Sequence, residues 1–215
     1  LPIVAIATEQ TAGRGQWGRQ WQSQPGGLYL SVALAPQIPA THAPHLTLCS
    51  AWGIATAIRH YQIPVLLKWP NDFILEGRKL GGIKSETHIQ QEIITQVVIG
   101  VGLNWTNPVP EVGITLQSFL QVQSNPAITS LEMLAAIALD GLLAAYQDYL
   151  SNGIETLLPS YLDLLQSRGR AVTVNGCPGV VVGITPQGDL RVRLQSAGAM
   201  TEICLAPGTT SLGYE

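Results

Sequence analysis

Positive charge in this chain gathers in two short segments that could together hold a polyanion. The first, residues 9–21, reads EQTAGRGQWGRQW and carries Arg14 and Arg19 among three glycines. The second, residues 66–86, reads LLKWPNDFILEGRKLGGIKSE and carries all three lysines of the chain. Arginine forks suit phosphates, glycines let backbone N–H groups approach an anion, and a tryptophan face can stack on a base. We therefore interpret the two segments as one polyanion site, although each residue alone also fits ordinary surface charge or an ordinary aromatic core.

The glycines of the first segment also spell the dinucleotide-binding pattern G-x-G-x-x-G. That pattern requires a helix directly after the glycines and an acidic residue about 20 residues further on. Here QSQPGG and an expected strand follow, and PQIPA at residues 36–40 holds no carboxylate. A Walker A loop would need G-K-[ST], which the chain lacks. We therefore reject both of these nucleotide motifs for Gly13, Gly15 and Gly18.

Glycines inside expected strands indicate a third part of the site. Gly100 and Gly102 alternate in VVIGVGLNW, residues 97–105, so both lie on one face of a strand and leave a smooth slot beside the backbone. Lys79 is followed by Leu-Gly-Gly, and paired glycines in a strand often mark the close approach of a ligand. A β-bulge or helix-on-sheet packing would explain the strand glycines equally well, and Pro70-Asn71-Asp72 alone is typical of an ordinary turn.

The composition excludes several classes of function. The 215 residues include 11 Lys and Arg against 14 Asp and Glu, so the net charge is −3, and we expect no binding of nucleic acid or anionic lipid. No apolar run reaches the roughly 18 residues of a membrane span, and residues 1–7 are too short for a signal peptide. Three widely spaced cysteines fit no disulfide framework, and His42 and His45 lack the partners of a zinc site. These features indicate a cytoplasmic protein.

The hydrophobic pattern predicts the elements that must position these residues. We expect a buried strand at residues 2–8 and further strands at 28–34, 65–69, 72–75, 79–86 and 92–103, the last of them central because it is so apolar. A helix is expected at 47–61, and residues 104–125 are expected to be irregular. Thr129 and Glu132 form a capping box for a helix that ends at Asn152-Gly153, and a further helix follows at 154–165. Short strands between turn signals then predict a small β-barrel from about 171 to 215.

Taken together, the motifs resemble the biotin protein ligases. That family shows a G-R-G-rich loop, K-W-P-N-D, R-K-L-x-G-[IL]-x-x-E and a G-x-G-[IL]-N strand, and this chain has GRGQWGRQW, KWPND, RKLGGIKSE and GVGLN in the same order. VGITPQGDLRVRL and PGTTSL also resemble the small C-terminal domain of the family. The resemblance implies an α/β (α+β) fold with a mixed sheet flanked by helices, related to class II aminoacyl-tRNA synthetases. It places a catalytic domain at residues 1–168 and an SH3-like barrel at 169–215.

The resemblance also implies a two-step reaction with biotin, ATP and Mg²⁺. The carboxylate of biotin attacks the α-phosphate of ATP, which gives biotinyl-5′-AMP and pyrophosphate. A lysine of the biotin carboxyl carrier domain of acetyl-CoA carboxylase then attacks the adenylate. A homodimer is compatible with the resemblance, and the sequence leaves the oligomeric state open.

Roles carry over from the family motifs to individual residues. Arg14 and Arg19 would hold the biotin carboxylate and the phosphates, and Lys79 would neutralise charge at the α-phosphate. Asn71 and Asp72 lie where Mg²⁺ and the incoming lysine would meet, so Asp72 is both the expected metal ligand and the expected proton acceptor. We thus expect Lys79, Arg14 and Asp72 to be catalytic.

Other residues are expected to bind the two small substrates. Gln10 would hydrogen-bond the ureido ring of biotin, Trp21 would pack on adenine, and Asn104 would lie on the nucleotide side. The remaining residues expected in this pocket are Gly13, Gly15, Gln16, Trp17, Gly18, Tyr29, Lys68, Gly82, Gly100 and Gly102.

Two departures and three rival interpretations accompany the resemblance. Family members usually carry D-S-T-N and a helix before the first strand, whereas this chain begins at Leu1 on that strand, so we expect an upstream segment to complete the biotin pocket. No helix-turn-helix is present, which favours a single-function ligase without a DNA-binding domain.

A lipoate–protein ligase would activate its substrate by the same adenylation chemistry, although KWPND favours biotin. A non-catalytic biotin- or nucleotide-binding protein is a second rival, and a nucleic-acid binder is poorly supported by the net charge.

The loop residues Gln16 and Trp17 stand where relatives of the family often have further cations. Because fewer cations should hold the adenylate less firmly, we predict that biotinyl-AMP leaks onto bystander lysines. The measurement is biotin labelling of a bystander protein by the wild type and by a Gln16→Arg variant. The variant should label less, and equal labelling by both proteins would refute the idea.

Overall fold

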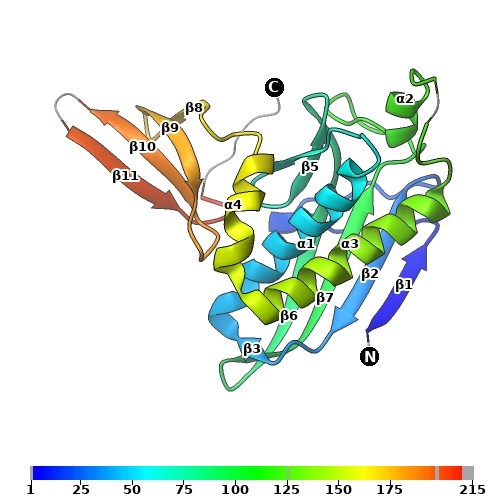
Figure 1. The fold of residues 1–215 in the computed structure, drawn as a ribbon, viewed down its shortest axis with the longest axis horizontal. Helices are drawn as coiled ribbons and strands as arrows, with labels where there is room; N and C mark the ends of the chain where they lie inside the picture. Colours follow the sequence, from blue (N-terminus) through cyan, green and yellow to red (C-terminus); the bar gives the residue numbers. More distant parts are fainter. Residues whose placement is uncertain (1, 125, 197–198, 210–215) are drawn as a thin grey trace.

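One β-sheet with two long helices on one face forms the larger part of the molecule (Figure 1). The computed structural model describes residues 2–124, 126–196 and 199–209, and the side chains of Trp17 and of residues 195–200 lie outside the described part. The sheet runs in the order β1-β2-β7-β6-β5-β4, and β3 also pairs with β7. Its strands are β1 (Ile3–Ala7), β2 (Leu28–Leu34), β3 (Ile38–Pro39), β4 (Leu66–Lys68), β5 (Asp72–Leu75), β6 (Arg78–Gln90) and β7 (Ile93–Leu103).

The helices α1 (Ala43–Arg59) and α3 (Leu131–Asn152) lie side by side over this sheet (Figure 1). Alternate residues of β7, from Val97 to Leu103, are buried against this layer, which leaves Val98, Gly100 and Gly102 for the other face. The shorter helices are η1 (Gln16–Gly18), η2 (Ala40–His42), α2 (Leu116–Leu120) and α4 (Ile154–Leu164).

A second sheet follows α4 and packs into the same core. It contains β8 (Ala171–Val174), β9 (Cys177–Ile184), β10 (Leu190–Ser196) and β11 (Ala199–Leu205) in the order β11-β10-β9-β8. Within the described residues β8 and β11 do not pair with each other, so the sheet is not closed into the expected barrel. Buried side chains of this sheet, among them Val181 and Leu190, join the hydrophobic cluster of the large sheet. The domain boundary at 168/169 therefore stays a prediction.

The expectation of a buried first strand was wrong. β1 pairs only with β2 at the edge of the sheet, and every one of its residues is exposed, including Ile3 at 71% and Ile6 at 59%. An apolar run predicts a strand, but whether that strand is buried depends on whether another layer of the structure covers it. The sequence contains no signal for that layer.

The expectation of a mixed sheet was also wrong, because every strand pair is antiparallel. Two-residue turns join the long strands: Glu76-Gly77 connects β5 to β6, and Gln91-Glu92 connects β6 to β7, all with positive φ. Turns of this kind can only join antiparallel neighbours, since a parallel pair needs a crossover connection. The central position of β7 was confirmed, since it pairs with β2, β3 and β6.

Smaller differences concern helix ends. α1 begins at Ala43, earlier than expected, with Pro44 in its first turn, where a proline is tolerated. Ser130, rather than Thr129, caps α3 by accepting from the Met133 N–H at 3.2 Å. The segment expected to be irregular contains α2. Within the described residues, no helix is long and apolar enough to cross a membrane.

Close packing of α1 on α3 depends on one glycine from each helix. A Cβ on Gly53 would collide with the Gly141 carbonyl and the Ala145 methyl group, and a Cβ on Gly141 would lie 2.7 Å from the Ala57 Cβ. The two backbones can therefore approach each other only without side chains at this crossing. The crossing joins the two helices that cover one face of the sheet (Figure 1).

We predict that Gly53→Ala lowers the free energy of unfolding by about 1–3 kcal/mol, because the added methyl group overpacks the crossing. Helix propensity alone would have the opposite sign, since alanine is favoured over glycine by about 1 kcal/mol. Urea unfolding followed by circular dichroism measures the change. The control is Gln147→Ala at an exposed position of α3, and a Gly53→Ala protein as stable as this control would contradict the packing argument.

Candidate functional site

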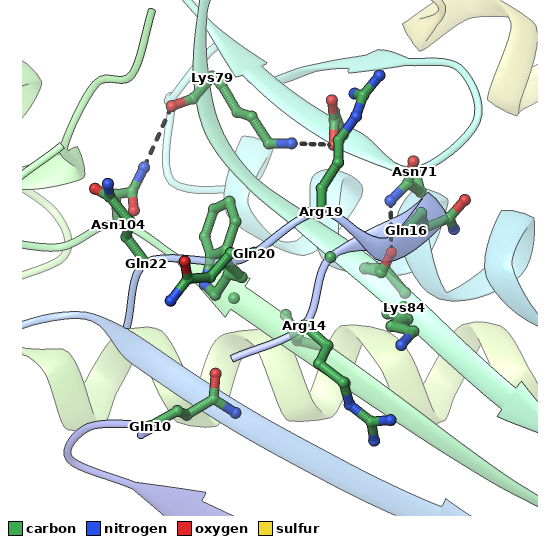
Figure 2. A pocket seen from close by; sticks show the side chains of 18 of the residues that line it. Gln10, Arg14, Gln16, Arg19, Gln20, Gln22, Asn71, Lys79, Lys84 and Asn104 are labelled. Atoms are coloured by element: carbon green, nitrogen blue, oxygen red, sulfur yellow. Dashed lines mark hydrogen bonds and ion pairs between the residues drawn. The ribbon is translucent and has the colours of Figure 1, made fainter. Parts of the chain in front are cut away.

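A cavity of about 880 Å³ lies on the face of the large sheet that α1 and α3 leave open. Its walls come from the glycine loop, from the turn between β4 and β5, and from the chain after β7 (Figure 2). Five cations line it: Arg14, Arg19, Lys68, Lys79 and Lys84. The lining contains two carboxylates, Asp72 and Glu86, so the cavity is cationic although the whole chain is acidic. Such a cavity suits a ligand with several negative charges.

Residues paired across β2, β7 and β6 form the floor of the cavity. Gly102 pairs with Tyr29 on β2 and with Gly82 on β6, and Gly100 pairs in the same way with Ser31 and Lys84. Because strand side chains alternate, Gly100 and Gly102 present bare backbone to the cavity. Of the predicted slot, the part over Gly100 is open, whereas the part over Gly102 is occupied by the Trp21 ring.

The indole of Trp21 fills the space that Gly102 leaves. A Cβ on Gly102 would lie 2.6 Å from Trp21 Nε1 and 3.0 Å from Trp21 Cζ2, so only glycine allows the ring this close. Lys79 Nζ lies 5.3 Å from the ring centroid, within the range of a cation–π contact. The Trp21 N–H is buried without a hydrogen-bond partner. The ring is thus clamped between strand β7 and a lysine.

Lys79 and Asp72 form the central ion pair of the cavity. Lys79 Nζ lies 2.6 Å from Asp72 Oδ1, and both side chains are mostly buried. Asp72 pairs with Gly82, but an irregularity in the register places Lys79 opposite Ile74. This bulge brings Lys79 onto the face of the hairpin that carries Asp72, as bulges commonly do near functional sites.

The chain after β7 holds the backbone of Lys79 from the other side. The Lys79 N–H donates to the Val112 carbonyl at 2.8 Å, and the Lys79 carbonyl accepts from the Ile114 N–H at 2.9 Å. The Asn104 amide also donates to the Lys79 carbonyl at 3.3 Å (Figure 2). Asn107 donates in turn to Asn104 Oδ1 at 3.1 Å. These bonds leave the lysine backbone little freedom.

The glycine loop is a short hairpin rather than the start of a helix. The Gly15 N–H donates to the Arg19 carbonyl at 2.8 Å, and the Trp21 N–H donates to the Gly13 carbonyl at 3.0 Å. Strand β2 follows, which confirms the rejection of the Rossmann motif. From this hairpin Arg14 reaches Glu86 at 3.3 Å, and Glu86 also pairs with Lys84 at 2.8 Å. These partners lower the pKa of Glu86, with the hydrogen bond from Lys84 as the largest cause.

Lys68 is a buried cation in the wall of the cavity. Its side chain lies at the end of β4, and the residue is 7% exposed. Burial lowers its pKa to about 8, Asp72 opposes this shift, and Lys79 and Arg19 add to it. Lys68 therefore loses its charge in a pH range where lysines in most proteins stay protonated.

The second sheet reaches the site through a turn. Trp69, the residue after Lys68, donates its indole N–H to the Gly188 carbonyl at 2.8 Å. Gly188 lies in the turn between β9 and β10 and has a φ of +88°. Gly208 and Thr209, after β11, also line the cavity. The start of the Trp69-Pro70-Asn71-Asp72 turn is thus anchored to the second sheet.

Most residues predicted for the site line the cavity. These are Gln10, Arg14, Gly15, Gln16, Arg19, Trp21, Lys68, Asn71, Asp72, Lys79, Gly82, Gly100, Gly102 and Asn104. Of the others, Gly13 lies beneath the loop against Ser23, Gly18 is on the exposed side of η1, and the side chain of Trp17 is outside the described part. Tyr29 was expected in the wall, but it is 3% exposed and its hydroxyl donates to the Gln24 carbonyl instead.

Several cavity residues were missed by sequence reasoning. Lys84 was counted among the lysines of the polyanion site without a role of its own, and Glu86 was missed. Strand alternation from Gly82 would have placed both on the cavity face. Asn107 lies in the segment expected to be irregular and had no predicted role. Arg78 of the second cationic segment does not line the cavity and donates to the Glu111 carbonyl, and Trp105 is a core residue.

Comparison with known proteins agrees with this geometry. Residues 2–104 match the model of the Biotin/lipoate A/B protein ligase family. The chain is 32% identical over 201 residues to the bifunctional ligase/repressor BirA of Bacillus spizizenii, which covers 89% of this chain and 62% of that relative. It is 35% identical over 126 residues to the biotin–[acetyl-CoA-carboxylase] ligase of Mycobacterium tuberculosis, which covers 56% of this chain and 46% of that relative. The chain therefore spans less than two thirds of these relatives.

A solved structure shows the same fold. The biotin protein ligase from Aquifex aeolicus in complex with biotin and ATP matches with a TM-score of 0.73 at 22% identity. The match covers 93% of this chain and 84% of the other.

The lowered pKa of Lys68 predicts how phosphate binding depends on pH. Below about pH 8 Lys68 is protonated and attracts a polyphosphate, and above that pH the neutral amine does not. We expect the affinity for a polyphosphate to fall as the pH rises from 7 to 9, by up to about fivefold for the loss of one such charge. Isothermal titration calorimetry with ATP as a polyphosphate probe measures this dependence. A Lys68→Arg variant keeps its charge throughout, so it should show a flatter profile, and an equal decline in both proteins would contradict the assignment.

Proposed function

Because residues 2–104 match the model of the Biotin/lipoate A/B protein ligase family, we propose that the chain attaches biotin to a lysine of the biotin carboxyl carrier domain of acetyl-CoA carboxylase, with consumption of ATP. The observation that carries the proposal is the position of Lys79, which lies between the Trp21 ring and Asp72 above a glycine floor. A cation beside an aromatic face, in a slot open to bare backbone, suits an acyl adenylate: phosphate on the cation, adenine on the ring, and acyl chain in the slot.

In the first step a carboxylate oxygen of biotin forms a bond to the α-phosphorus of ATP, and the bond to the β-phosphate oxygen breaks. Pyrophosphate leaves and biotinyl-5′-AMP remains. Negative charge builds up on the α-phosphate, where Lys79 would exchange its Asp72 partner for a phosphate oxygen. Arg14 and Arg19 project from the hairpin into the cavity and would hold the carboxylate and the departing phosphates (Figure 2).

In the second step the carrier lysine attacks the acyl carbon of the adenylate. A new amide bond forms, the acyl–phosphate bond breaks, and AMP leaves with the electron pair. The attacking amine must lose a proton, and Asp72 is the carboxylate beside the position assigned to the α-phosphate. When Lys79 turns to the phosphate, Asp72 loses the positive charge at 2.6 Å that disfavours its protonation, and it would then accept that proton. The ion pair thus separates into the two groups that serve successive steps.

Recognition of the two substrates uses the rest of the lining. Gln10 would bind the ureido ring, Gly82, Gly100 and Gly102 would line the slot, and Asn104 would lie on the nucleotide side. The hairpin would shield the adenylate from water, which would otherwise hydrolyse a mixed anhydride.

Mg²⁺ belongs to the proposal as an ion brought with ATP. Among the described residues no group of three or more His, Cys, Asp or Glu side chains could hold a metal. Mg²⁺ is often held by one or two carboxylates together with substrate phosphates, and Asp72 fits that arrangement as the single carboxylate. Asn71 donates its amide N–H to the Ile83 carbonyl at 2.6 Å, which leaves its side-chain oxygen as a second candidate ligand. The ion would neutralise phosphate charge.

The alternatives remain distinguishable. A lipoate–protein ligase of the same family would adenylate lipoate, and a non-catalytic binder would hold biotin or nucleotide without turnover. Four expectations from the sequence also stay predictions. They are an SH3-like form of the second sheet, a relation to class II aminoacyl-tRNA synthetases, a homodimer and a cytoplasmic location.

The test of the proposed function is biotin-dependent exchange of labelled pyrophosphate into ATP, with lipoate run in parallel. We expect exchange with biotin and none with lipoate. Exchange with lipoate would select the related ligase, and binding of biotin without exchange would select the non-catalytic protein. Transfer to a purified carrier domain, detected as a biotinylated lysine by mass spectrometry, then tests the second step.

The position of Lys79 generates a sharper prediction. Lys79→Gln should slow pyrophosphate exchange by about 10²–10³-fold, the usual cost of removing one group that stabilises transition-state charge. Biotin binding, measured by calorimetry, should change little because Lys79 acts on the phosphate. The matched control is Arg78→Gln, since the neighbouring Arg78 does not line the cavity. Equal losses of the exchange rate in both variants would show that the rate depends on positive charge near the turn and not on the lysine in the cavity.

A further inference from the structure

A buried serine holds one of the side chains that faces the cavity. Ser23 is 6% exposed and lies between the hairpin and β2. Its hydroxyl donates to Gln10 Oε1 at 2.6 Å, and its carbonyl accepts the Gln10 N–H at 3.0 Å. Among the described residues that line the cavity, Gln10 is present and Ser23 is not. Ser23 therefore holds Gln10 from outside the cavity through two hydrogen bonds, one from its side chain and one to its backbone.

The packing around this contact admits only glycine at position 13. A Cβ on Gly13 would collide with Ser23 Oγ and with the Trp21 carbonyl, and it would lie 3.0 Å from Gln10 Oε1. The role of Gly13 is thus to let the loop close over the pair of Gln10 and Ser23. This explains why Gly13, predicted as a ligand-binding residue, lies beneath the loop.

The hydrogen bond also determines which end of the Gln10 amide faces the ligand. Ser23 Oγ has a second acceptor, the Trp21 carbonyl, at 3.2 Å. A hydroxyl has one proton, and the shorter contact with Gln10 receives it. The carbonyl end of the amide is therefore occupied, and its N–H groups remain for the cavity. They would recognise a hydrogen-bond acceptor.

We propose that Ser23 is a positioning residue that holds the Gln10 amide with its N–H groups toward the acceptor oxygen of the biotin head. This inference rests on the proposed function, in which the ureido carbonyl of biotin is such an oxygen. A free glutamine loses rotamer freedom when it binds a ligand, whereas a glutamine already held by Ser23 does not. Ser23 thereby raises the affinity for biotin without touching it.

A double-mutant cycle in the pyrophosphate exchange assay tests this role. The proteins are the wild type, Ser23→Ala, Gln10→Ala and the double variant, each with KM for biotin, KM for ATP and kcat. We expect Ser23→Ala to raise KM for biotin about three- to tenfold, the effect of one hydrogen bond, with KM for ATP and kcat near the wild-type values. Because Ser23 acts through Gln10, the double variant should bind biotin no worse than Gln10→Ala alone.

Ser23→Cys separates the hydrogen bond from the packing. Cysteine nearly keeps the shape of serine but is a weak donor, so it should behave like Ser23→Ala. Gln10→Glu tests the orientation of the amide, since it keeps the acceptor for Ser23 and replaces the donors toward biotin. It should lose at least as much affinity as Gln10→Ala.

The outcomes distinguish the proposal from its premise. Additive effects in the cycle, wild-type affinity in Ser23→Cys, or equal rises in KM for ATP and biotin would each overturn the role of Ser23 while the ligase function stands. Wild-type affinity in Gln10→Glu would overturn the orientation of the amide. A wild type without biotin-dependent exchange would overturn the proposed function itself and, with it, this inference.

Discussion

The site depends on the ion pair between Lys79 and Asp72. Their side chains meet at 2.6 Å inside the cavity and are 24% and 14% exposed. A pair so far out of water stabilises only if each charge keeps its partner, because an unpaired buried charge is costly. The bulge between β5 and β6 creates the pair, since it moves Lys79 onto the face of Asp72. The network around the Lys79 backbone then keeps that geometry.

The other charges of the cavity are held less firmly. Arg14 and Glu86 are 71% and 48% exposed, and ion pairs of that kind contribute about 0–1 kcal/mol. A phosphate or carboxylate could therefore replace Glu86 at Arg14 at little cost. The contrast divides the site into a rigid wall, formed by β5, β6 and the chain after β7, and a hairpin whose arginines can change partners.

The second sheet belongs to the structure of the site. Its turn accepts a hydrogen bond from Trp69, and a Cβ on Gly188 would lie 2.9 Å from Pro44 Cβ in α1. Tyr149 of α3 lies 3.0 Å from His45 Nδ1 and 3.1 Å from His42 Nδ1, so these histidines serve the junction of helices rather than a metal. Burial lowers the pKa of His45, with His42 as a further cause. The polar groups of this junction bond to one another, and Trp69 bonds to the second sheet at Gly188.

The sequence by itself determined the cationic segments, the glycines that face the cavity and most strand positions, because these follow from local residue types and from strand alternation. Its motifs also carried the resemblance to the biotin protein ligases. It could not determine the burial of β1 or the partner of Tyr29, since each depends on what packs against the strand. The antiparallel pairing throughout was not predicted either, although the two-residue turns at 76–77 and 91–92 allow no other pairing of the strands that they join. It also missed Glu86, which strand alternation from Gly82 would have placed on the cavity face, and Ser23, which has no local signature. Only the tertiary structure decided that Lys79 meets Asp72 and that Ser23 holds Gln10. Both contacts arise from register and loop closure, which bring together residues whose spacing along the chain says nothing about their distance.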